Sequence, residues 1–216
     1  MDSLMTVISS FACWLYTMQV SRHSCEDPNF PSRLRETVSV VVDYDLPAVE
    51  NMSFETLQKV KKLVMIISER VPFEPKMSEL WSRLVTNNDL GLRMLYALDK
   101  AQILMLLSSK SKNYKFLYKP NKIFLGNTNL MHVLCPTVHK GNERETYFCS
   151  LLSVLHNVQY PLKGDFLVDG HYLFEVGGRS KSFEQIADIP NSFLAVDETE
   201  VGYGNRIPLW MFGFTY

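Results

Sequence analysis

The stretch GDFLVDGHYLFEVGGRSK, residues 164–181, decides how the C-terminal part of the chain is interpreted. Two apolar, alternating runs flank an Asp-Gly pair, and this pattern predicts an antiparallel β-hairpin. Asp165 lies on the first arm and Glu175 on the second, and two glycines and two cations follow. The hairpin is therefore the first place to look for a chemical site.

The register of this hairpin decides whether its two carboxylates meet. A two-residue loop, Asp169-Gly170, would place Asp165 opposite Phe174 and turn Glu175 to the other face. A three-residue loop with a bulge would place Asp165 opposite Glu175. The second register also gathers apolar side chains on one face: Phe166, Val168, Tyr172 and Phe174. We favour it because register follows the segregation of the two faces.

Paired carboxylates across two strands predict a candidate metal site. At about 5 Å from each other, Asp165 and Glu175 can hold a hard divalent cation such as Mg²⁺, which would polarise a phosphodiester and activate water. A cation two positions after Glu175 would point to the same side. Gly177 occupies that position, so Lys181 can serve only if the chain curls back.

The hairpin has two other interpretations, a purely structural role and a phosphate-binding loop. Asp165 can cap the strand entry while Glu175 is an exposed strand residue, which is a purely structural role. The segment VGGRSKS is similar to a phosphate-binding loop, but the pattern G-x-x-x-x-G-K-[ST] occurs nowhere in the sequence. The phosphate-binding loop is therefore excluded, and the purely structural role stays open.

Upstream of the hairpin, the order of elements predicts a winged-helix domain over residues 51–126. Ser53 is a potential N-cap for a helix over 53–71, which ends before prolines. Two shorter helices, 78–85 and 90–102, are joined by a tight turn, and a hairpin follows over 103–125. Three helices and a hairpin are typical of this domain.

The hairpin at 103–125 carries the one basic cluster of the chain, interleaved with aromatic residues. Its lysines are Lys110, Lys112, Lys115, Lys119 and Lys122. Such a cluster suits contact with the phosphate backbone of DNA, although lysines are also ordinary at a solvated hairpin tip. The preceding helix is poor in cations and is a weak base reader, so docking of a protein partner is the alternative.

The remainder predicts a mixed α/β domain over 127–216 and an N-terminal helical segment with a connector over 1–50. Helices are expected at 127–134, 141–155 and 182–189, and a strand at 192–197, so that strand, helix and strand form a βαβ unit. Residues 21–36 are interpreted as the connector. The apolar stretch 4–20 predicts a buried or partly exposed helix rather than an export signal or membrane span.

Composition excludes several classes of function. The net charge is −1, so any contact with nucleic acid must come from a local patch. The four cysteines form no C-x-x-C pair, which argues against a zinc site and a disulfide framework and favours the cytoplasm. The histidines show no metal-ligand spacing.

Several segments together resemble the C-terminal region of prokaryotic AAA-type ATPases. They are DYDLPAVENMSFETLQKVKKLVMIISERVPFEPKMSEL, KIFLGNTNLMHVL, GNERETYFCSLLSVL, GDFLVDGHYLFEVGG and QIADIPNSFLAVDETEVGYGNRIPLWMFGF. In that family a P-loop ATPase core precedes a winged helix and a domain of unknown function related to the PD-(D/E)xK nuclease fold. The resemblance covers about residues 37–216.

The resemblance implies a winged-helix domain followed by a restriction-endonuclease-like mixed-sheet domain. Glu145 matches the helical acidic position, and Asp165 and Glu175 match the two strand carboxylates. Gly177 stands where the family fold has a lysine, and Lys181 would be a migrated substitute. ATP would bind only through an upstream domain that is missing here, so that the chain looks like a truncated or separately encoded remnant.

The sequence therefore favours a non-ATPase module of an AAA-type ATPase that binds nucleic acid or a partner such as the ATPase domain. Its nuclease-like site would be degenerate and catalysis absent from this chain. The alternatives are a divalent-metal-dependent nuclease, with Mg²⁺ at Asp165 and Glu175, and a purely protein-docking module.

Overall fold

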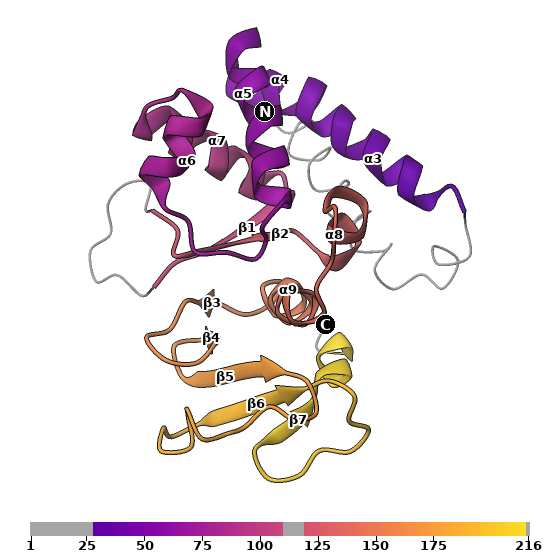
Figure 1. The fold of residues 1–216 in the computed structure, drawn as a ribbon, viewed down its shortest axis with the longest axis vertical. Helices are drawn as coiled ribbons and strands as arrows, with labels where there is room; N and C mark the ends of the chain where they lie inside the picture. The colour runs from indigo at the N-terminus through magenta and orange to yellow at the C-terminus, as the bar shows by residue number, and fades with distance from the viewer. Residues whose placement is uncertain (1–27, 110–118, 215–216) are drawn as a thin grey trace.

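The computed structural model describes residues 28–109 and 119–214. The apolar stretch 4–20 lies outside these ranges. So do three lysines of the predicted hairpin at 103–125: Lys110, Lys112 and Lys115. Figure 1 shows a helical N-terminal half, a mixed β-sheet in the C-terminal half, and helix α9 (Lys140–Leu152) between them. The predicted combination of helices with a mixed sheet is confirmed. Within the described ranges, no helix is both long and apolar enough to cross a bilayer.

The segment that was interpreted as a connector is helical from residue 30 onward. Helix α3 (Phe30–Val40), a π-helical turn η1 (Val41–Asp45) and α4 (Leu46–Glu50) follow one another without interruption. Pro31 stands in the first turn of α3, where a missing backbone N–H costs no hydrogen bond. Prolines therefore marked the beginning of a helix rather than an irregular segment. The Arg35 side chain donates to the Val133 carbonyl at 3.2 Å, which connects α3 to α8 (Thr128–Leu134).

The three predicted helices and the hairpin that follows them are present. They are α5 (Phe54–Ser68), α6 (Met77–Leu84), α7 (Asn88–Lys100), β1 (Leu104–Leu107) and β2 (Lys122–Leu125). Ser53 caps α5 by accepting from the Thr56 N–H at 3.2 Å. Between α5 and α6, Phe73 forms an antiparallel bridge with Ile123, whose backbone groups exchange hydrogen bonds of 3.2 and 3.0 Å.

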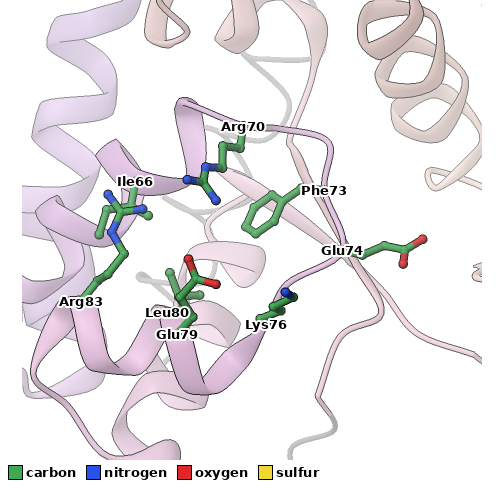
Figure 2. Close-up of a pocket in the computed structure, with 8 residues that line it drawn as sticks. All are labelled: Ile66, Arg70, Phe73, Glu74, Lys76, Glu79, Leu80 and Arg83. Carbon is green, nitrogen blue, oxygen red and sulfur yellow. The ribbon is translucent and has the colours of Figure 1, made fainter.

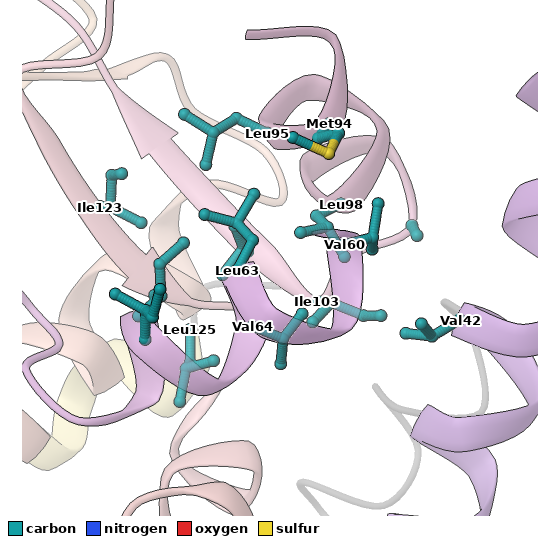
Figure 3. Packing of buried hydrophobic residues seen from close by; sticks show 14 of the residues in the cluster. Val42, Val60, Leu63, Val64, Met94, Leu95, Leu98, Ile103, Ile123 and Leu125 are labelled. Atoms are coloured by element: carbon teal, nitrogen blue, oxygen red, sulfur yellow. The ribbon is translucent and has the colours of Figure 1, made fainter. Parts of the chain in front are cut away.

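The β1–β2 ribbon lies between two hydrophobic cores. Ile123 and Leu125 pack into the N-terminal core with α5 and α7, as Figure 3 shows, whereas Phe124 packs into the C-terminal core with α9. Because side chains alternate along a strand, Lys122 shares the face of Phe124 and points toward α9. A ribbon that is buried on both faces explains why both strands read as continuous apolar runs.

Asp99, near the end of α7, is a partly buried carboxylate whose oxygen Oδ1 accepts from the Leu106 N–H at 2.9 Å. Burial raises the pKa of Asp99 to about 6, against the opposing effect of that hydrogen bond. Between the pKa of the unfolded state and that of the folded state, the folded chain retains a proton that the unfolded chain has lost. The free energy of unfolding therefore falls as pH rises through this window.

We expect Asp99→Asn to stabilise the protein at pH 8, by an amount of the order of 2 kcal/mol. Asparagine retains an acceptor for the Leu106 N–H and removes the buried charge. Urea denaturation at pH 5 and pH 8 is the measurement, and the gain should shrink at the lower pH. The exposed Asp188→Asn is the matched control; an equal effect of both variants at both pH values would contradict the assignment.

The C-terminal half forms a five-stranded mixed sheet below α8 (Thr128–Leu134) and α9 (Lys140–Leu152). Its strands, in spatial order, are β3 (Val158–Gln159), β4 (Phe166–Val168), β5 (Tyr172–Gly177), β6 (Ser192–Val196) and β7 (Arg206–Pro208). The first three are antiparallel, and β5, β6 and β7 are parallel. A 3₁₀-helical segment η2 (Leu209–Phe214) follows β7 and packs against α9.

The predicted helix over 182–189 is wrong, because this part of the β5–β6 connection is a series of turns. Ser182 accepts from the Glu184 N–H, and i→i+3 backbone bonds follow at Ile186 and Ile189. The segment holds only eight residues and ends at Pro190, which disfavours helical geometry in the residue before it. The parallel pairing of the flanking strands is as predicted.

Candidate functional site

The hairpin adopts the three-residue-loop register. Phe166 pairs with Phe174 and Val168 with Tyr172, which leaves Asp169, Gly170 and His171 as the loop. The regular ladder ends at Phe166, and Asp165 and Glu175 stand just beyond the Phe166–Phe174 pair on their two strands. Asp169 and Gly170 both have positive φ, 53° and 67°, a conformation that an Asp-Gly pair adopts readily. The two-residue loop is therefore wrong.

Asp165 and Glu175 differ in their surroundings. The Asp165 N–H donates to the Phe174 carbonyl at 2.9 Å, and its oxygen Oδ2 accepts from the Val176 N–H at 2.8 Å, so this side chain continues the ladder. Glu175 is only 1% exposed, so its interpretation as an exposed strand residue is wrong. Burial raises the pKa of Glu175; Lys181 opposes the shift and Asp165 adds to it.

Lys181 occupies the space in which a side chain at position 177 would lie. A Cβ atom built on Gly177 would stand 2.7 Å from both Cβ and Cγ of Lys181, far inside van der Waals contact. The chain curls through a turn in which the Lys181 N–H donates to the Gly178 carbonyl at 2.9 Å. The Lys181 ammonium then lies 3.6 Å from Glu175 Oε2. Glycine at 177 is therefore a steric requirement for the return of this lysine.

Glu145, on α9, completes the acidic group and is paired with Lys122 of β2. The Lys122 Nζ lies 2.6 Å from Glu145 Oε2, and the two side chains are 14% and 22% exposed. Burial raises the pKa of Glu145; Lys122 opposes this shift, and Asp165 contributes to it. Glu145, Asp165 and Glu175 with Lys122 and Lys181 form what we call the carboxylate site.

The lysines predicted to bind nucleic acid are therefore not one surface in the described part of the chain. Lys122 is drawn into the carboxylate site and lies over the Phe124 ring, 5.4 Å from its centroid. Lys119, which precedes Pro120 in the chain, is exposed. Lys110, Lys112 and Lys115 lie outside the described residues.

Tyr160 and Glu74 form a contact beside the carboxylate site that the sequence did not indicate. The Tyr160 hydroxyl donates to Glu74 Oε1, and its backbone N–H donates to the Ser108 carbonyl at 3.0 Å. The hydrogen bond from the Tyr160 hydroxyl to Glu74, together with burial and the charges of Glu74 and Asp165, raises the pKa of Tyr160 to about 12. Glu74 lies 86 positions earlier in the chain, so no local pattern links the two residues.

Within residues 28–109 and 119–214, no three His, Cys, Asp or Glu side chains are grouped so as to hold a metal ion. Comparison of the chain with protein-family models, with curated proteins and with solved structures found no match. The function must therefore be argued from the geometry of the site.

Proposed function

We propose that the chain is a divalent-metal-dependent nuclease in which a winged-helix unit is joined to a restriction-endonuclease-like unit. The observation that carries the proposal is the return of Lys181 into the space above Gly177. Two strand carboxylates and one lysine are the residues that phosphodiester hydrolysis of this kind uses. The lysine is displaced in sequence, but its ammonium lies beside the second carboxylate.

The N-terminal unit supports the winged-helix half of the proposal through its topology. The chain runs through α5, the extended residue Phe73, α6, α7 and the β1–β2 hairpin, and Phe73 pairs with β2, which thus lies between Phe73 and β1. A short strand between the first two helices that joins a C-terminal hairpin is the arrangement expected of this domain. The same order of helices was predicted from the sequence.

The oxygen ligands of Asp165 and Glu175 are of the type that a hard divalent cation such as Mg²⁺ takes, and water would have to complete its coordination, because the described residues group no third ligand with them. The buried oxygen Glu175 Oε2 has the Lys181 ammonium at 3.6 Å and makes no shorter hydrogen bond among the described residues, so it can accept a further ligand. Three carboxylates face two ammonium groups, so the site keeps one net negative charge. Asp165 and Glu175 would hold the cation, which when bound polarises the phosphodiester and activates water.

The other residues of the site would act on charge and position. The Lys181 ammonium would donate to a phosphate oxygen, where negative charge increases as the phosphorus–oxygen bond breaks. Lys122 would keep Glu145 ionised and fixed, since removal of one partner from a buried pair leaves the other charge uncompensated. Because Lys122 comes from β2, the site would be incomplete without the N-terminal unit.

We expect the protein to bind Mn²⁺, a substitute for Mg²⁺ in calorimetry, and to cleave DNA or RNA in its presence. Asp165→Asn should weaken Mn²⁺ binding by at least about tenfold, because one of two carboxylate ligands loses its charge. Asp188→Asn, an exposed acidic residue outside the site, should bind as the wild type does. No Mn²⁺ binding by the wild-type protein, together with no cleavage, would sink the proposal.

A second candidate is the non-catalytic module, attached to an AAA-type ATPase, that the sequence favoured. The observation in its favour is that two carboxylates of the site already have ammonium partners. Lys122 pairs with Glu145 and Lys181 with Glu175, so the two lysines supply the positive charge that a metal ion would otherwise supply. On this view the two ammonium groups replace the metal permanently. It predicts that the wild-type protein binds nucleic acid or an ATPase domain but not Mn²⁺.

A further inference from the structure

A pocket of about 180 Å³ opens between the end of α5, the segment that leads to α6, and α6 itself. Figure 2 shows the guanidinium groups of Arg70 and Arg83 beside it, with the ring of Phe73 facing the same space. Lys76 and Glu79 lie at its lower edge. The residues that line the pocket are different from those of the carboxylate site.

The pocket has an excess of positive charge. Arg70 and Lys76 are exposed and form no ion pair within the described part of the chain, and Arg83 makes only a 3.7 Å contact with Glu69. Glu74, although it lines the pocket, points away from the two arginines and is held by Tyr160. Three cations and two carboxylates line the pocket, and because Glu74 is turned away toward Tyr160, the side that carries the two arginines favours an anionic ligand.

The aromatic wall of the pocket is held rigidly. The backbone N–H and carbonyl of Phe73 are both bonded to Ile123, and two residues earlier the Val71 carbonyl accepts from Asn142 Nδ2 at 3.1 Å. The Phe73 ring remains half-buried, so part of it is open to the pocket. A fixed ring beside paired guanidinium groups is prepared for a flat, negatively charged ligand with little loss of conformational entropy on binding.

We propose that this pocket binds one nucleotide of a nucleic-acid strand, with its phosphate on Arg70 and Arg83 and its base against Phe73. Guanidinium groups hold phosphate in a bidentate manner, and bases stack on aromatic side chains irrespective of sequence. An acidic peptide would satisfy the arginines but would supply no flat ring for Phe73. The nucleotide is therefore the ligand class that uses both walls.

This inference rests on the proposed function and deepens it, because the pocket lies beside the carboxylate site. Phe73, which lines the pocket, pairs with Ile123 of β2, and the preceding residue of that strand, Lys122, belongs to the carboxylate site. A strand held in the pocket would thus continue toward the carboxylates. The pocket would supply substrate binding, and the carboxylate site the chemistry.

The test is fluorescence anisotropy of short, labelled single-stranded DNA and RNA in the presence of EDTA. Arg70→Gln and Arg83→Gln should each weaken binding by about tenfold and lower the slope of log K against log salt, since each removes one of the two charges that neutralise the bound phosphate. Phe73→Leu should weaken binding by about tenfold or more and leave that slope unchanged, because only stacking is lost.

Lys62→Gln is the matched control, because it removes the same charge from the exposed surface of α5 outside the pocket. An equal loss in this variant would reduce the effect to general charge and overturn the proposal. No binding by the wild type to either oligonucleotide, or wild-type binding by the three pocket variants, would also overturn it. Because EDTA removes divalent metal, these outcomes are independent of Mn²⁺ binding at the carboxylate site, which tests the proposed function.

Discussion

Lys181→Met is expected to reduce metal-dependent cleavage by about 100-fold or more, the usual loss when one charged group that stabilises the transition state is removed. Methionine retains the apolar stem that fills the space above Gly177 and removes only the ammonium group. Affinity for Mn²⁺ should be retained or increase, since Glu175 loses a competing cation. Single-turnover cleavage and calorimetry separate these two effects.

A transposed lysine is the sharper version of this experiment. Gly177→Lys combined with Lys181→Gly places the ammonium on β5 and removes the Cβ, Cγ and Cδ atoms with which the new side chain would clash, so a part of the lost activity should return. Gly177→Ala alone should impair activity, because the new methyl group must expel Lys181. Lys163→Met, an exposed lysine outside the site, is the control. Unchanged cleavage by Lys181→Met would show that this lysine has no role in the chemistry.

The register of the hairpin could be predicted because one face of it is buried. In the three-residue-loop register, Phe166 and Phe174 share a face, and the structure places both in the C-terminal core. A shift of one residue would have exposed an aromatic side chain. The three-residue loop follows from that apolar pattern, so local sequence could place Asp165 and Glu175 on neighbouring strands just beyond the Phe166–Phe174 pair.

Lys122 was assigned to a DNA-binding surface because the sequence cannot tell which way a strand faces when both of its faces are apolar. Ile123 and Phe124 enter different cores, and only the three-dimensional arrangement shows that α9 lies on the side of Phe124. The neighbouring lysine is thereby directed to Glu145. Likewise, the contact of Glu74 with Tyr160 joins two distant segments and leaves no periodic signal in the sequence.

The position of Lys181 could be predicted only in part from the sequence. The two glycines indicated that the chain might curl, but a glycine permits many paths and selects none. The turns at 182–189, which replace the expected helix, fix the direction by burying Ile186, whose carbonyl accepts from the Ser192 hydroxyl at 2.8 Å. Local helical propensity was therefore overridden by a tertiary contact.

Phe148→Ala is expected to destabilise the protein by about 4 kcal/mol, because it opens a large cavity in the C-terminal core. Phe148 is fully buried on α9, and its ring centroid lies 5.0 Å from those of Phe166 and Phe174 and 4.8 Å from that of Phe212. It therefore joins the helix to both arms of the hairpin and to η2. Aromatic pairs add to the burial term, by about 0.5–1.5 kcal/mol each.

Urea denaturation, followed by circular dichroism, measures this loss, and Phe54→Ala is the matched control. Phe54 is 77% exposed at the first turn of α5, so removal of its ring should change the free energy of unfolding by less than about 0.5 kcal/mol. Because Phe174 precedes Glu175 on β5, loss of the Phe148 ring should also loosen the carboxylate site and weaken Mn²⁺ binding. Equal stabilities of the two variants would show that α9 does not hold the sheet in the way described.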